Sequence, residues 1–306
     1  MRGSVRPFDG DRGVRYATER IETEPRPLRD TMYTGGSEER RAAATLLGSP
    51  YTEVLAMSAM AGNEILDLVR PSIFRLETKF GDTIRWGTAF AVGRQVTKNG
   101  LVLATAAHVL RFPPDTERVA WTLQQFDQDG YVERELRTET PGAREGSIQF
   151  SRNDKFDSGV CILPNRTTDG EPFTRDNERP LRMIAKESMA PEGTRVGWAG
   201  FAGIVEEYLK HPQLCYFEGV ISAAVNRPER PVYIVDGHSA HGVSGGPLWR
   251  WTDENQVEVI GIMSAYRGSK MMGLPGFCVF EPIQPVSYYL ERVSEEARAE
   301  IAAQEA

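Results

Sequence analysis

The sequence predicts a mainly β fold with helices before the strands and one helix at the end. From Pro71 onward the chain consists of short apolar runs separated by turn residues, which is typical of an all-β barrel or sandwich. Upstream of Pro71, two helix-start signals precede the strands, and in the last segment Leu290, Val293 and Ala297 recur at helical spacing. A chain of 306 residues is long enough for one large domain or two barrel halves.

Composition and charge exclude several classes of protein. The apolar content of 40% and the charged content of 26% are those of an ordinary globular protein, and the net charge of −7 argues against nucleic-acid binding. No run approaches the ~20 apolar residues of a membrane helix, and residues 1–10 lack the apolar core of a secretion signal. Cys161, Cys215 and Cys278 lie singly in predicted strands, which indicates small buried side chains rather than disulfides. These observations favour a cytoplasmic protein.

Residues 1–69 are predicted to form an N-terminal extension. Residues 1–36 are rich in Arg, Glu, Gly and Pro and carry mixed charge, so we expect a flexible segment that becomes ordered only on docking. Ser37 is placed to cap a helix over 38–47, and a second start signal precedes a helix over 51–69. These helices either cover a barrel edge or contact an activator or inhibitor.

The first part of the β region contains one histidine and one aspartate in notable positions. His108 ends an apolar run, and Asp157 begins another. Asp154 is an alternative acid, but it precedes the apolar pattern rather than opening it, so Asp157 is preferred. The Pro- and Gly-containing loop 163–181 is the expected link to the second part. The predicted strands here are 87–92, 101–110, 119–126, 131–136 and 157–163, with turns at 98–100 and 127–130.

A serine set among glycines marks the second part of the β region. Ser244 lies within His241-Gly242-Val243-Ser244-Gly245-Gly246-Pro247, ahead of the apolar run 257–263. Glycines allow backbone angles that other residues avoid, and they let a substrate carbonyl approach the main chain. The N–H groups of Gly242 and Ser244 are therefore candidates for an oxyanion hole. A serine nucleophile needs a histidine base and a carboxylate that orients it, which His108 and Asp157 would supply.

Three segments together resemble the signature motifs of trypsin-like serine proteases. They are Thr105-Ala106-Ala107-His108, Asp157-Ser158-Gly159-Val160 and Gly242-Val243-Ser244-Gly245-Gly246-Pro247, and they occur in that family's His, Asp, Ser order. Further likeness points to the bacterial branch that includes the HtrA and glutamyl-endopeptidase proteases, although the sequence carries no segment for the PDZ module that HtrA proteins append.

The resemblance implies two six-stranded antiparallel β-barrels. Barrel 1 is expected over about 70–165, barrel 2 over about 181–282 and a C-terminal helix over about 284–304, so that residues 70–306 form the protease domain. It also implies that Ser264, Ala265 and Tyr266 pair with an extended substrate and that Gly276 begins the strand closing the specificity pocket. Ser264 would in addition support the triad aspartate.

Two departures from the family pattern affect regulation and specificity. Val243 stands before the serine, where digestive relatives have an aspartate that pairs with a freshly cleaved N-terminus, so that switch cannot operate here. His238 occupies the region of the primary specificity residue, where it either contacts an acidic substrate side chain or is a loop histidine without such a role. His238 and His241 have no third ligand at suitable spacing, so no metal is expected.

The sequence therefore predicts a serine endopeptidase that acts through His108, Asp157 and Ser244 without a cofactor. Its expected partner is a protein or peptide substrate, either one dedicated protein or the varied substrates of quality control. The alternative is a protease-fold scaffold that has lost turnover. No nucleic-acid or membrane partner is expected.

Overall fold

The computed structural model describes twelve stretches, all within the compact unit Met60–Ala306. They are residues 62–95, 100–113, 115–127, 129–141, 150–153, 155–167, 169–173, 181–183, 189–226, 231–252, 257–267 and 276–292. The predicted segment 1–36, the helix over 38–47, Asp154 and the C-terminal residues beyond 292 lie outside the described residues. Of the helix predicted over 51–69, residues 62–69 are described, and they are helical.

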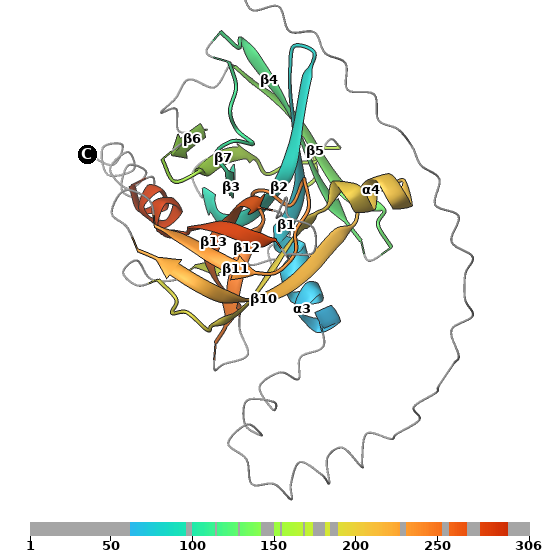
Figure 1. Cartoon of the computed structure of the whole chain (residues 1–306). Helices are drawn as coiled ribbons and strands as arrows, with labels where there is room; N and C mark the ends of the chain where they lie inside the picture. Colours follow the sequence, from blue (N-terminus) through green and yellow to red (C-terminus); the bar gives the residue numbers. More distant parts are fainter. Residues whose placement is uncertain are drawn as a thin grey trace, which may run out of the picture. The chain divides into compact units, whose positions relative to one another are not determined.

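The first sheet contains seven antiparallel strands, drawn from cyan to green in Figure 1. It follows α3 (Gly62–Val69) and a 3-10 turn at Arg70–Ser72. The strand order is β5-β4-β1-β2-β3-β7-β6. The strands are β1 Ile73–Phe80, β2 Thr83–Gln95, β3 Gly100–Ala106, β4 Arg118–Phe126, β5 Val132–Pro141, β6 Phe150–Asn153 and β7 Ser158–Pro164.

The second sheet closes on itself. Its order is β12-β9-β10-β11-β14-β13-β8, and β12 also pairs with β13, so six antiparallel strands form a ring while β8 adds to β13 in parallel. The strands are β8 Arg182–Met183, β9 Arg195–Phe201, β10 Leu214–Val225, β11 Val232–Asp236, β12 Pro247–Trp251, β13 Val257–Arg267 and β14 Phe277–Pro282. The predicted mainly β architecture is confirmed. Each six-stranded sheet is extended in the described residues by one short strand, β6 in the first and β8 in the second.

Strands β3 and β7, together with residues 87–92 of β2, are buried on both faces, which explains their largely apolar sequences. Successive side chains on a strand point to opposite faces. Leu101 and Leu103 of β3 accordingly belong to the core inside the first barrel, whereas Val102 and Ala104 pack with the core of the second. All seven residues of β3 are buried. This double burial brings the ends of these strands to the junction between the barrels, where the predicted site lies.

Helices occupy three places in the described chain. The apolar residues Ile65 and Val69 of α3 are buried in the core shared with the second barrel. Residues 284–292 form the described part of the predicted C-terminal helix. The sequence analysis did not predict the helix α4 (Gly203–Leu209). Its side chains Ile204 and Tyr208 are exposed, so the helix lacks the regularly spaced buried apolar residues by which a helix is recognised in a sequence. No helix in the described part of the chain is long and apolar enough to cross a bilayer.

Candidate active site

The pairing of β3 with β7 brings His108 beside Asp157. The two strands are antiparallel with Ala106 opposite Ser158, so the residues that follow β3 meet the residue that precedes β7. The Ala107 N–H donates to the Asp157 carbonyl at 3.0 Å, which continues the ladder by one step. His108 stands in the turn that begins there. Two residues 49 positions apart in the chain are thus adjacent because two apolar strands pair in one register.

The Asp157 carboxylate accepts three kinds of hydrogen bond. His108 Nδ1 lies 2.9 Å from Oδ2, the His108 backbone N–H donates to Oδ1 at 2.9 Å, and the Ser264 hydroxyl donates to Oδ2 at 2.6 Å. Burial by itself raises the pKa of Asp157, but the hydrogen bonds from His108 and Ser264 outweigh it and hold the pKa below its ordinary value. The carboxylate is therefore ionised and fixes the orientation of the imidazole, leaving Nε2 directed away from it.

Ser244 lies in a tight turn between β11 and β12. The Gly245 N–H donates to the Met263 carbonyl at 2.7 Å, and the Met263 N–H donates to the Gly246 carbonyl at 2.8 Å, which anchors the turn on β13. Gly245 has φ of 89°, and a Cβ atom there would collide with Thr105 Oγ1 and Thr88 O. Only glycine fits this position, because both the backbone angle and the space exclude a side chain.

Gly87 connects the serine turn to the histidine turn. A Cβ atom on Gly87 would lie 2.9 Å from the Ser244 carbonyl oxygen and 2.9 Å from Val109 Cγ2. The Ser244 carbonyl and the side chain of the residue after His108 therefore both pack against the space where a Gly87 side chain would lie. The Thr88 N–H also donates to the Ser244 carbonyl at 2.8 Å. The serine turn therefore packs beside the turn that carries His108, which Asp157 contacts.

The candidate oxyanion donors are the N–H groups of Gly242 and Ser244. Each belongs to a peptide group whose carbonyl accepts a backbone hydrogen bond, which fixes the orientation of that peptide. The Gly203 N–H donates to the His241 carbonyl at 2.8 Å, and the Gly246 N–H donates to the Val243 carbonyl at 2.9 Å. Because N–H and C=O point in opposite directions across a trans peptide, the N–H groups of Gly242 and Ser244 point away from these donors. Gly242 has φ of 95°, so its conformation also depends on being glycine.

Thr88 is a supporting residue that sequence reasoning missed. Its hydroxyl donates to the Gly242 carbonyl at 2.9 Å and accepts from the Phe201 N–H at 3.1 Å, and the whole side chain is buried. The Thr105 hydroxyl donates to the Thr88 carbonyl at 2.7 Å. The sequence did contain a sign of this role, which is a threonine within the apolar run 87–92. A buried hydroxyl group needs hydrogen-bond partners, so such a threonine indicates a polar contact in the core.

The predicted substrate-binding residues lie on β13 and near the start of β14. Ser264 is buried, Ala265 is half-buried and Tyr266 is partly exposed. Strand β12 pairs with β13 only as far as Ile262, so beyond that residue this edge of β13 has no partner strand in the described part of the chain. The Tyr266 ring covers Gly276, whose Cβ atom would lie 2.5 Å from Tyr266 Cζ.

The two loop histidines and Val243 have different environments. His238 and His241 are exposed, whereas Val243 is fully buried and its Cα would lie 2.9 Å from a Cβ atom on Gly200. Apolar packing therefore surrounds the residue before Ser244. Among the residues that the structure describes, no three His, Cys, Asp or Glu side chains are grouped to hold a metal ion.

Comparison with known proteins identifies the fold. No protein-family model and no curated protein sequence matches the chain. Among solved structures, the HtrA-type protease AlgW with a tripeptide matches with a TM-score of 0.51 and 17% identity, over 78% of this chain and 65% of AlgW. The serine endoprotease of Yersinia pestis matches with a TM-score of 0.49 and 15% identity, over 78% of this chain and 68% of that one. The likeness to AlgW shows that the chain has the two-barrel trypsin-like fold.

Proposed function

We propose that this protein is a serine endopeptidase whose triad is Ser244, His108 and Asp157. The observation that carries the proposal is the Asp157 carboxylate, which binds His108 Nδ1 and the Ser264 hydroxyl while Ser244 and Val109 pack against the same glycine. This arrangement leaves Nε2 of His108 as the atom available to Ser244. A scaffold without turnover would not need an ionised carboxylate oriented on an imidazole.

In the proposed reaction, the Ser244 hydroxyl oxygen attacks the scissile carbonyl carbon while His108 Nε2 takes its proton. The carbonyl oxygen becomes an oxyanion that accepts hydrogen bonds from the Gly242 and Ser244 N–H groups. His108 then gives the proton to the leaving amine, which leaves an acyl group on Ser244. A water attacks the acyl carbon as His108 again takes a proton; the bond from the acyl carbon to the Ser244 oxygen then breaks, His108 returns the proton to that oxygen, and the acid product departs. Asp157 stabilises the imidazolium in both steps without being protonated.

We propose that the substrate binds as an added strand on β13. The edge beyond Ile262 is open in the described residues, and Ser264, Ala265 and Tyr266 follow it. Main-chain hydrogen bonds to such an edge bind a peptide irrespective of its side chains. Tyr266, Gly276 and His238 would then contact the side chain before the cleaved bond and set its preference. The partner is a protein or peptide, with a cytoplasmic site of action, and residues 1–69 are the proposed contact for an activator or inhibitor.

The test is cleavage of a diverse peptide library by the full-length protein, read by mass spectrometry, with Ser244→Ala as the matched control. The proposal predicts new termini that share a common residue before the cut and that vanish with Ser244→Ala. Cleavage of one protein but not of the library would favour a dedicated substrate over quality control. Binding of peptides without any cleavage, by both forms alike, would contradict the proposal and favour the scaffold.

A further inference from the structure

A tryptophan outside the triad packs directly on the oxyanion turn. Trp86, on β2, lies against Gly242: a Cβ atom there would collide with Trp86 Cζ3 and would lie 2.6 Å from Cη2. The same indole edge faces Gly203, whose Cβ atom would lie 2.6 Å from Cη2. The ring of His241 meets it edge-on, with centroids 5.2 Å apart. Trp86 therefore contacts both ends of the Gly203-to-His241 hydrogen bond that orients the Gly242 peptide.

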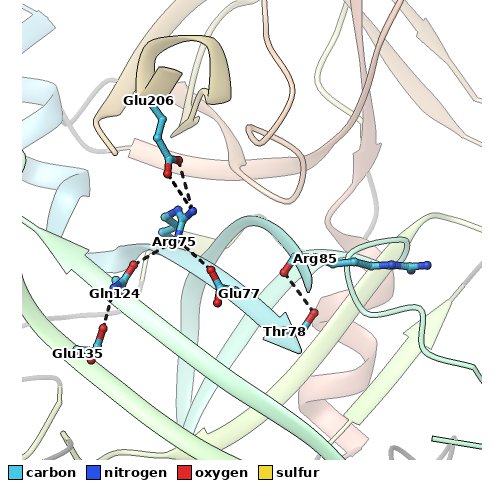
Figure 2. Close-up of polar contacts among 7 residues, drawn as sticks. All are labelled: Arg75, Glu77, Thr78, Arg85, Gln124, Glu135 and Glu206. Carbon is cyan, nitrogen blue, oxygen red and sulfur yellow. Dashed lines mark hydrogen bonds and ion pairs between the residues drawn. The ribbon is translucent and has the colours of Figure 1, made fainter. Parts of the chain in front are cut away.

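The indole is in turn held by a partly buried arginine. The Arg75 guanidinium lies 5.3 Å from the centre of the Trp86 ring, and its side chain is only 12% exposed. As Figure 2 shows, Arg75 reaches Glu206 of α4 on one side, at 3.2 and 3.4 Å, and Glu77 and Gln124 of the first sheet on the other, each at 3.4 Å. These contacts fix the orientation of the Arg75 guanidinium group, which lies over the indole ring.

The Arg75 contacts also attach α4 to the first barrel. Glu206 is on the helix whose first residue, Gly203, donates to the His241 carbonyl. Strand β1 carries Arg75 and β2 carries Trp86, and the two strands pair with Arg75 opposite Thr88. Trp86 thus contacts both the start of α4 and the oxyanion turn, and Arg75 connects Trp86 to α4. These contacts join residues of both barrels.

We propose that Trp86 is a positioning residue that holds the Gly242 peptide with its N–H directed to the oxyanion, and that Arg75 and Glu206 hold Trp86 in place. The proposal rests on the proposed function. The peptide between His241 and Gly242 can flip, because glycine adopts positive and negative φ angles with similar ease. A flip would turn the His241 carbonyl away from the Gly203 N–H and would misdirect the Gly242 N–H. Trp86 fills the space beside Gly242, which keeps the turn against Gly203.

The expected effect is on turnover rather than on substrate binding. Loss of one oxyanion donor costs about 10²–10³ in kcat. Trp86→Ala should therefore lower kcat by about 100-fold while KM changes less than about three-fold, because the β13 edge is untouched. The affinity for a peptide boronate, which mimics the oxyanion, should fall in parallel with kcat/KM. Trp86→Phe, which keeps an aromatic edge, should recover most of the loss.

Substitution of Arg75, which packs against Trp86, should give a smaller decrease in kcat. Arg75→Met removes the cation over the indole, and a cation–π contact of 0.5–1 kcal/mol corresponds to a decrease of about two- to five-fold in kcat. Arg118→Met serves as the matched control, since Arg118 pairs with Glu139 on the exposed surface of the same sheet. Thermal unfolding of every variant distinguishes misfolding from a displaced turn.

Hydrogen exchange tests the positioning without relying on activity. Full-length wild type and Trp86→Ala are compared by amide exchange, with Trp121→Phe as a control at another tryptophan of the first sheet. The proposal predicts exchange at Gly203 and in the peptide covering 241–245 that is at least about ten-fold faster in Trp86→Ala, and unchanged in the control. Unchanged exchange, or equal losses of kcat in Trp86→Phe and Trp86→Ala, would overturn it. A wild type that exchanges as expected but turns over no substrate would instead contradict the proposed function.

Discussion

The acid–base side of the site and the oxyanion side are held in different ways. His108 and Asp157 are placed by two paired strands of one barrel, with hydrogen bonds between neighbouring residues of the ladder. The turn that carries Gly242 and Ser244 is anchored by backbone hydrogen bonds within its own barrel, and it also contacts the side chains of Thr88 and Trp86 from the other barrel. The first arrangement is built into the core of a sheet, whereas the second depends on contacts across a junction. We expect the His108–Asp157 pair to be rigid, and we expect the turn of Gly242 and Ser244 to be more easily displaced by substitutions of the residues around it.

Removing the base should have the largest effect. His108→Ala takes away the group proposed to accept the Ser244 proton, so kcat on a peptide amide should fall by about a million-fold. Adding Ser244→Ala to it should cost almost nothing more, since residues that act as one unit are not additive. A double variant much slower than either single variant would show that the two residues do not act together.

Replacing the orienting acid should have the next largest effect. Asp157→Asn keeps the shape but favours the wrong imidazole tautomer, and we expect a decrease of about 10⁴-fold in kcat with KM little changed. Steady-state kinetics and the unfolding temperature measure this. Full activity would instead assign the acid role to another carboxylate, Asp154 being the alternative in the sequence.

The oxyanion side is tested by Thr88→Val, which keeps the shape of the side chain and removes its hydroxyl. The Gly242 carbonyl and the Phe201 N–H would each lose a buried partner, at a cost of about 1–3 kcal/mol each in the free energy of unfolding. Thr78→Val is the matched control, because Thr78 is equally buried but makes one long hydrogen bond of 3.5 Å. Similar destabilisation by both changes would refute the special role of Thr88.

The smallest effect concerns the pKa of Asp157. The Ser264 hydroxyl donates to the ionised carboxylate, so Ser264→Ala should raise the pKa of Asp157 in the folded protein. A depressed folded-state pKa stabilises the fold above the unfolded pKa, and this stability is lost as pH falls through the folded-state pKa. Ser264→Ala should therefore lose stability at a higher pH on acidification, as measured by carboxyl NMR and by unfolding at several pH values. An unchanged pKa would mean that the hydrogen bond is absent in solution.

The strands and the three triad candidates could be predicted because their signals are local. The runs that became β3 and β7 are continuously apolar, and His108 and Asp157 stand at their ends. Ser244 was found among glycines that the structure shows to be required by backbone angle and space at Gly245. In each case a few neighbouring residues carry the information.

The supports of the oxyanion turn could not be predicted because their partners are far apart in the chain. Thr88 and Gly242 are separated by 154 positions, and Arg75 and Glu206 by 131. No local pattern records such a contact. The helix α4 was also missed, since it has only 7 residues and exposes its large apolar side chains. The sequence predicted candidates for the catalytic residues, but not the residues that hold the turn.

The central claim is that Ser244 is activated by His108 and Asp157 in the folded protein. The most direct measurement is covalent labelling with a fluorophosphonate, read by intact mass and mapped to a residue, for wild type, Ser244→Ala and Asp157→Asn. The account predicts one adduct on Ser244, none in Ser244→Ala, and much slower labelling in Asp157→Asn. A folded wild type that carries no adduct, or one labelled on another residue, would contradict it.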